Sequence, residues 1–334
     1  MPTKHKVLFA LAFGYFGCYV PYSAISKALT SAKIAGDATV TGLMLLPIMT
    51  VASTVAMLAT ITALGWWRYA RGPTGTAWPH PNRWTLLSGL ATAMILVTTT
   101  LAYTFEGVSI GFVMLIMRGG VLIVAPVIDM LTGRRIRWFS WIALGLSIAS
   151  LANALLTRVG NVPMWCAIDL ACYLLGYVIR LRLMAKLGKS EDSAVRRRYF
   201  VEEQMVAAPA AVALIALFAV IGPPAVQWQL RQGFGHLWST PTAWWALAAG
   251  VFSQGTGVFG GLMLLDASEA TYCVPLNRAM SILGGVVAAT GLALWFGISP
   301  PSLGELVGAG LLVTAIGVLW VGPRVTHARR TQSG

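Results

Sequence analysis

The chain has 334 residues, of which 57% are hydrophobic and only 10% are charged. Soluble domains carry about 25% charged residues, so this composition excludes an ordinary soluble protein. The formal net charge of +13 would suit a nucleic-acid-binding protein, but the basic residues lie between long apolar runs and indicate contact with anionic lipid headgroups instead.

Apolar runs long enough to cross a bilayer recur from one end of the chain to the other. Only helices and closed barrels satisfy their backbone groups in lipid, and barrel strands would alternate in polarity. The sequence therefore predicts an all-α integral membrane protein with ten transmembrane helices. They are expected at 7–29, 40–64, 84–105, 108–131, 138–156, 162–179, 205–221, 243–265, 270–296 and 303–321. The first is too long for a signal-peptide core and is interpreted as a mature span.

Most of the 24 basic residues fall on one side of these spans when the N-terminus is placed inside. They are Lys4, Lys6, Arg68, Arg71, Arg83, Arg134, Arg135, Arg137, Arg180, Arg182, Lys186, Lys189, Arg196, Arg197, Arg198, Arg324, Arg329 and Arg330. This positive-inside bias predicts that both termini are cytoplasmic. The pattern is typical of a bacterial inner membrane, with a eukaryotic endomembrane as the alternative. Glu202 and Glu203 are expected at the cytoplasmic start of the seventh span, where they complement the helix dipole.

The two halves of the sequence repeat each other. Arg118 (LIMRGG) and Arg278 (PLNRAM) lie 160 positions apart, in corresponding spans. Tyr15 and Tyr19 of the first span correspond to Tyr173 and Tyr177 of the sixth, 158 positions later. Five spans in each half place the second half upside down, which is the inverted-repeat architecture of alternating-access transporters. We expect a first repeat over 1–157, a sixth helix with a basic loop over 158–200, and the rest of the second repeat over 201–334.

The stretches 107–151 and 268–320 carry a resemblance to a known family. The first has a helix with Pro126, a short basic loop and a glycine-containing helix, and the second has the same layout. With the span count, this layout resembles the drug/metabolite transporter superfamily of ten-helix, EamA-like transporters. Many members carry a glutamate after the fourth helix, whereas this chain reads Thr132 to Arg135. The resemblance implies a secondary transporter, and some branches move phosphorylated sugars or nucleotide sugars.

Arg118 and Arg278 are the main candidates for substrate binding. A charge near the bilayer centre costs at least ~2.5 kcal/mol and usually marks function. Two guanidiniums facing one cavity would bind a phosphate or carboxylate through paired hydrogen bonds. The alternative is an internal ion pair that fixes helix packing. Asp129 is too far along its helix to neutralise Arg118, and Asp169 is a possible partner from another helix.

Further polar residues at membrane depth complete the predicted site. Those assigned to substrate binding besides the arginines are Asn277, Tyr15, Tyr19, Tyr173, Tyr177 and Gln254. The tyrosines could line a cavity or simply pack, and the two amides could contact substrate or bond between helices. Asp169 is the candidate for a proton-coupling carboxylate. The loop 223–241, with two tryptophans, is expected along the outer interface.

The leading hypothesis is a secondary-active transporter or exchanger for an anionic, phosphate-bearing organic solute or lipid-linked headgroup. The alternative within the class is an exporter of amino acids or amphipathic drugs. An integral-membrane lipid-modifying enzyme is the alternative from another class, but the connectors show no accompanying nucleophile or histidine. No catalytic residue, metal or cofactor is expected. The predicted partners are a small-molecule or lipid-phosphate substrate and membrane lipids, without nucleic acid.

Overall fold

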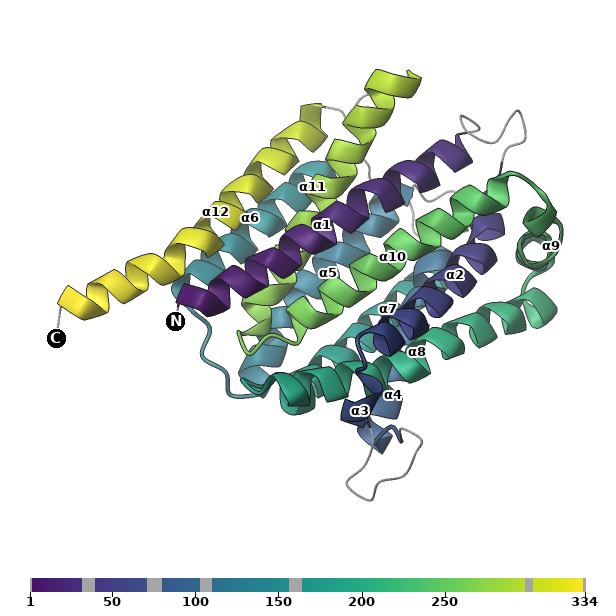
Figure 1. Cartoon of the computed structure of the whole chain (residues 1–334). Helices are drawn as coiled ribbons and strands as arrows, with labels where there is room; N and C mark the ends of the chain where they lie inside the picture. Colours follow the sequence, from purple (N-terminus) through teal and green to yellow (C-terminus); the bar gives the residue numbers. More distant parts are fainter. Residues whose placement is uncertain are drawn as a thin grey trace.

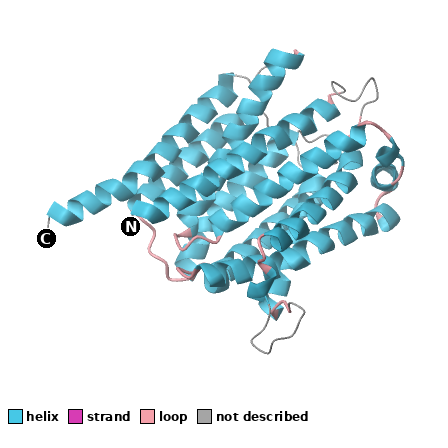
Figure 2. Ribbon diagram, in the orientation of Figure 1, coloured by secondary structure: helices cyan, strands magenta, loops and turns pink. Residues whose placement is uncertain are grey.

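The computed structural model describes residues 2–31, 40–70, 80–102, 110–155, 164–297 and 303–332. Nearly all of these residues are helical, and no β-strand occurs among them (Figure 2). This confirms the all-α class that the apolar runs predict.

Ten helices in the described part of the chain have 18 residues or more. They are α1 (Pro2–Thr30), α2 (Gly42–Ala63), α4 (Arg83–Ala102), α5 (Ile110–Leu131), α6 (Trp138–Leu155), α7 (Met164–Leu183), α8 (Ser193–Ile221), α10 (Thr242–Leu264), α11 (Ala270–Phe296) and α12 (Leu303–Gln332). The shorter elements are α3 (Trp67–Ala70), η1 (Met184–Gly188), α9 (Pro224–Phe234) and η2 (His236–Ser239).

Six of the helices contain segments long and apolar enough to cross a bilayer. These segments are Lys6–Thr30, Gly42–Ala63, Ser193–Ile221, Thr242–Leu264, Ala270–Phe296 and Leu306–Pro323. Large apolar side chains also point outward, for example Trp295, which is 82% exposed, and Trp244, which is 76% exposed. Such side chains on an outer surface are favourable only where lipid covers them. The protein is therefore a multi-pass membrane protein.

The long helices lie side by side in one bundle, and both termini are at the same end of it (Figure 1). Helix α1 packs against α10 and α11, while α7 packs against α4 and α5. Helix α2 lies against α10 and α8, and α6 pairs with α12. Helices from the two halves of the sequence are thus interleaved through the bundle.

Two helix boundaries differ from the predicted spans in a way that matters for the site. Helix α7 continues to Leu183 and then into the π-helical turn η1, and α8 begins already at Ser193. Arg180 and Glu203 therefore lie within helices and inside the bundle. A span predicted from hydropathy ends at the first charged residue. It therefore omits these turns, whose charged side chains pair with each other inside the bundle.

The loop expected along the outer interface contains helix α9, which packs against α2 and α8. Its apolar side is buried through Val226 and Leu230, while Trp228 is exposed. Gly233 permits this packing, since a Cβ there would lie 2.3 Å from the Met44 carbonyl oxygen.

Candidate functional site

Arg278 is the ninth residue of α11 and lies two turns inside the helix. Its Nη2 donates a hydrogen bond of 2.6 Å to the Tyr177 hydroxyl, and its Cζ lies 5.1 Å from the centre of the Tyr177 ring. Its Nε is buried without a hydrogen-bond partner. Among the described residues no carboxylate pairs with Arg278. The guanidinium thus keeps donor capacity and a positive charge that the described protein groups do not neutralise.

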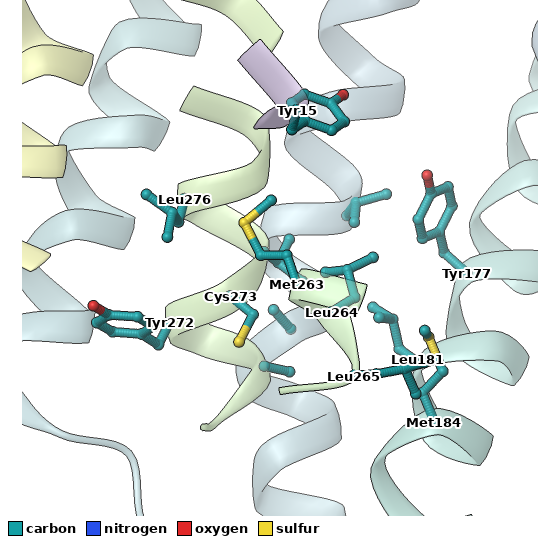
Figure 3. Packing of buried hydrophobic residues seen from close by; sticks show 14 of the residues in the cluster. Tyr15, Tyr177, Leu181, Met184, Met263, Leu264, Leu265, Tyr272, Cys273 and Leu276 are labelled. Atoms are coloured by element: carbon teal, nitrogen blue, oxygen red, sulfur yellow. The ribbon is translucent and has the colours of Figure 1, made fainter. Parts of the chain in front are cut away.

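Tyrosines from two helices gather around this arginine. Tyr173 and Tyr177 follow each other on one face of α7, with ring centroids 4.9 Å apart and both side chains buried. Tyr15, on α1, is buried as well, and both Tyr15 and Tyr173 interact electrostatically with the Arg278 charge. Figure 3 shows Tyr15 and Tyr177 in the same buried cluster, on different helices. The structure thus brings Tyr15, Tyr173 and Tyr177 together with Arg278.

Tyr19 lies one turn further along α1 and stacks on Tyr15, with ring centroids 5.7 Å apart. Both rings reach neighbouring helices at glycines. A Cβ on Gly260 of α10 would lie 3.0 Å from the Tyr15 ring, and one on Gly284 of α11 would lie 2.9 Å from the Tyr19 ring. The missing side chains let the aromatic face of α1 press against α10 and α11.

The two amides predicted at the site have different surroundings. Asn277 is buried beside Arg278, and its Nδ2 would lie 3.1 Å from a Cβ on Gly260. Gln254 accepts a hydrogen bond of 2.9 Å from the Ser53 hydroxyl and donates to the Met57 sulfur, so it joins α10 to α2. Interhelical bonding accounts for both polar ends of Gln254, and it leaves Asn277 as the amide next to the arginine.

Asp169 lies on the same face of α7 as Tyr173 and Tyr177, because the three residues are spaced four apart. Its side chain is buried, and its Oδ2 has no hydrogen-bond partner. Arg118 is placed within α5, but its side chain lies outside the described residues. The predicted meeting of the two arginines in one cavity stays a prediction.

A buried ion pair that the sequence analysis did not anticipate lies next to this site. Arg180 donates to Glu203 from Nε at 2.9 Å and from Nη2 at 3.2 Å. Glu203 is fully buried and also accepts from the Ser88 hydroxyl at 2.7 Å and the Thr92 hydroxyl at 3.1 Å. The pair joins α7, α8 and α4. Glu202 and Glu203 are expected from the sequence at the start of the seventh span, but α8 begins at Ser193 and both side chains are buried. Glu202 pairs with Arg198 at 2.7 Å.

An apolar layer of buried side chains lies below Tyr15 and Tyr177 in the view of Figure 3. Its side chains are all buried and come from α7, η1, α10 and the residue that follows α10. They are Leu181, Met184, Met263, Leu264 and Leu265. These side chains fill the interior below the two tyrosines with apolar atoms.

A second polar cluster fixes the helix ends beyond that layer. Asp129 accepts hydrogen bonds from the Ala270 and Thr271 amides at 2.9 and 2.6 Å, and so caps the start of α11. Arg137 donates from Nε to both carboxylate oxygens of Glu269, at 2.8 and 3.0 Å. Burial alone would raise the pKa of Glu269, but the hydrogen bond and charge of Arg137 and the Ser140 hydroxyl outweigh it and lower the pKa.

No group of three or more histidine, cysteine, aspartate or glutamate side chains that could hold a metal ion occurs among the described residues. Among the described residues, the candidate site brings together Arg278, three phenols, the Asn277 amide and the Asp169 carboxyl group. Such a set can bind an organic anion through charge-assisted hydrogen bonds and can stack on a planar group.

Comparison with known proteins supports the fold alone. No family model matches the chain, and no curated protein matches its sequence. A chain from a solved crystal structure superposes with a TM-score of 0.60 at 15% sequence identity, over 95% of this chain and 98% of that chain. The two chains therefore share their fold over nearly the whole length.

Proposed function

We propose that the chain is a secondary-active transporter or exchanger that moves an anionic, phosphate-bearing organic solute or lipid-linked headgroup. In this proposal ten helices span a bacterial inner membrane as two inverted five-helix repeats, with both termini in the cytoplasm. Arg278 binds the anion, and the two halves rock to expose it to either side.

The contacts between helices support the inverted repeat. In an inverted repeat, α1 would correspond to α7, α2 to α8, α4 to α10 and α5 to α11. Each contact in one half should then have a counterpart. The contacts α1–α10, α1–α11 and α2–α10 do have the counterparts α7–α4, α7–α5 and α8–α4. Matched glycines support the same exchange. A Cβ on Gly89 of α4 would lie 2.9 Å from the Glu203 carbonyl oxygen of α8, and one on Gly250 of α10 would lie 2.5 Å from the Met49 carbonyl oxygen of α2.

The observation that carries the proposal is the uncompensated charge of Arg278. A buried charge without a partner is costly, so such groups are normally paired. Arg180 has Glu203, whereas Arg278 has only a neutral phenol and a buried Nε without an acceptor. An anionic substrate would supply the missing acceptor and charge, and the tyrosines would hold its planar part.

The position of Asp169 favours a role in coupling transport to an ion gradient over a contact with the substrate group that binds Arg278. It lies eight residues before Tyr177 on α7, which corresponds to about 12 Å along the helix axis. An amino acid carries its carboxylate and amine much closer together than that. A buried carboxyl group at this distance is suited to take up a proton or cation whose gradient drives transport.

The experiment is a ligand-induced thermal-shift screen on the purified full chain. It compares sugar phosphates, nucleotides, nucleotide sugars and short-chain lipid phosphates with amino acids and organic cations. Arg278→Gln and Tyr177→Phe are the test variants, and Arg182→Gln, at an exposed arginine on α7, is the charge-matched control. We expect stabilisation by one phosphate-bearing class that Arg278→Gln abolishes and Arg182→Gln retains. Stabilisation by amino acids or cations that survives Arg278→Gln would contradict the proposal and favour an exporter of such solutes.

A further inference from the structure

Two arginines, one on α3 and one near the start of α8, converge on one tyrosine just beyond the end of α2. Arg197 Nη1 donates a hydrogen bond of 2.7 Å to the Tyr69 hydroxyl oxygen, and Arg68 Nη2 donates to the same oxygen at 3.2 Å. Both guanidiniums also lie over aromatic rings. The Cζ of Arg68 is 5.0 Å from the Tyr69 ring centre, and that of Arg197 is 5.5 Å from the Trp66 ring centre. The contacts hold two positive charges side by side around one neutral oxygen.

The neighbouring basic residues show that this arrangement is specific to Arg197. Arg198 is paired with Glu202 at 2.7 Å, and Arg196 donates to the carbonyl oxygens of Ser190 and Glu191. Within the described residues, by contrast, no carboxylate forms an ion pair with Arg197 or Arg68. Two like charges held together without a counter-ion repel each other, so an anion between them would be favourable.

The electrostatics of Tyr69 point the same way. Hydrogen bonds from Arg197 and then Arg68 lower the pKa of its phenol, and burial opposes this only in part. The environment therefore favours negative charge at this position. Arg68 is exposed and Arg197 and Tyr69 are half-buried, so a ligand can reach the guanidiniums from outside.

The position of the cluster identifies the kind of anion. Residues 66–70 directly follow the end of the apolar helix α2, which Leu64 terminates, and they contain two adjacent tryptophans. Tryptophan and arginine at the end of a membrane span occupy the depth of the lipid headgroups. The phosphate of an anionic phospholipid is held at the same depth, and a guanidinium fork binds phosphate through paired donors.

We propose that Arg68, Tyr69 and Arg197 form a binding site for the phosphate of an anionic phospholipid headgroup. The lipid would join α3 to the start of α8, which are linked here by the Arg197–Tyr69 hydrogen bond. The site is separate from Arg278 and does not depend on the proposed transport function.

The test is native mass spectrometry of the full chain in detergent, titrated with phosphatidylglycerol, with phosphatidylcholine, and with inorganic phosphate alone. The test variants are Arg68→Gln and Arg197→Gln. Arg182→Gln removes the same charge from an exposed arginine on α7 and serves as the control. The thermal stability of each variant without lipid is measured in parallel to confirm that it is folded.

We expect the wild-type chain to bind phosphatidylglycerol in preference to phosphatidylcholine. Each test variant should weaken phosphatidylglycerol binding about fivefold, which corresponds to ~1 kcal/mol for each basic residue at an anionic membrane surface. The control should change it less than twofold. An equal loss in all three variants, or no preference between the lipids, would overturn the site. Inorganic phosphate that binds as tightly as the lipid would overturn the lipid assignment.

Discussion

Arg180 and Glu203 form a buried ion pair with two hydrogen bonds, three residues along α7 from the tyrosine that receives Arg278. The two interior arginines therefore differ in kind. Arg180 is neutralised by a carboxylate that two hydroxyls also support, whereas Arg278 contacts a neutral phenol. The proposed function accordingly treats Arg180 as a structural residue and Arg278 as the anion-binding residue, and substitution can test the difference.

Loss of either member of the Arg180–Glu203 pair should destabilise the protein strongly. Arg180→Gln or Glu203→Gln leaves a buried group without its partner, and breaking such a pair typically costs about 3–5 kcal/mol. The double variant Arg180→Gln/Glu203→Gln removes both charges and should regain most of that stability. Equilibrium unfolding of the purified protein in mixed micelles measures the difference. Full additivity of the two single losses in the double variant would mean that the residues are not coupled.

Arg278→Gln should leave the fold intact. The substitution strands no carboxylate among the described residues, so we expect a change in unfolding free energy within about 1 kcal/mol. The same variant should lose the thermal shift produced by the anionic solute. A collapse of stability as large as that of Arg180→Gln would show that Arg278 is a structural residue.

The glycine contacts between helices should be intolerant of even one methyl group. Gly250→Ala would place a Cβ 2.5 Å from the Met49 carbonyl oxygen and 2.7 Å from the Ala52 side chain, so the backbones of α10 and α2 must move apart. We expect a loss of about 1–3 kcal/mol. Gly285→Ala, on α11, is the matched control because nothing lies within 4 Å of its Cβ position. Equal effects of the two substitutions on the midpoint of unfolding would argue against close helix packing at Gly250.

Acid should lower the stability of the protein by protonating Glu269, which pairs with Arg137. Its pKa is lowered in the folded state, so its ionised form contributes stability above the unfolded pKa of about 4.3. That contribution is lost as the pH falls through the folded value. Melting curves between neutral pH and about pH 3 should therefore show a stability loss that Glu269→Gln reduces, because the variant lacks the contribution throughout. An unchanged pH profile in the variant would show that other carboxylates dominate.

The proposed rocking of the two halves should open the apolar layer around Leu265 during turnover. In a variant without the native cysteines, Leu265→Cys places a thiol in this buried layer. A small water-soluble maleimide is added on the side of the membrane where α8 begins. It should label this thiol slowly without solute and faster during solute exchange. Ser193→Cys, at the exposed start of α8, should label at one rate in both conditions. A constant rate at residue 265 would contradict alternating access through this layer.

The helical class and the membrane environment could be predicted from the sequence because length and hydropathy alone determine whether a helix can span lipid. Tyr177 and Arg278, which the sequence predicts for one site, lie within hydrogen-bond distance of each other, and their role in substrate binding stays a prediction. The sequence reasoning missed the Arg180–Glu203 pair because apolar windows end at charged residues, and they cannot tell a charge paired across helices from a charge in water. The same limit applied to Asp129, which caps α11 from the end of α5. Partners so far apart in sequence become visible only once the helices are packed.

The most direct test of the central claim is counterflow in liposomes that contain the purified protein. The vesicles are loaded with the unlabelled phosphate-bearing solute that gives the largest thermal shift, and uptake of its labelled form is followed in wild type, Arg278→Gln and Arg182→Gln. The account predicts a transient accumulation of label in wild type and in Arg182→Gln, and uptake at the level of protein-free vesicles in Arg278→Gln. Undiminished counterflow in Arg278→Gln, or none in wild type for any solute that binds, would contradict it.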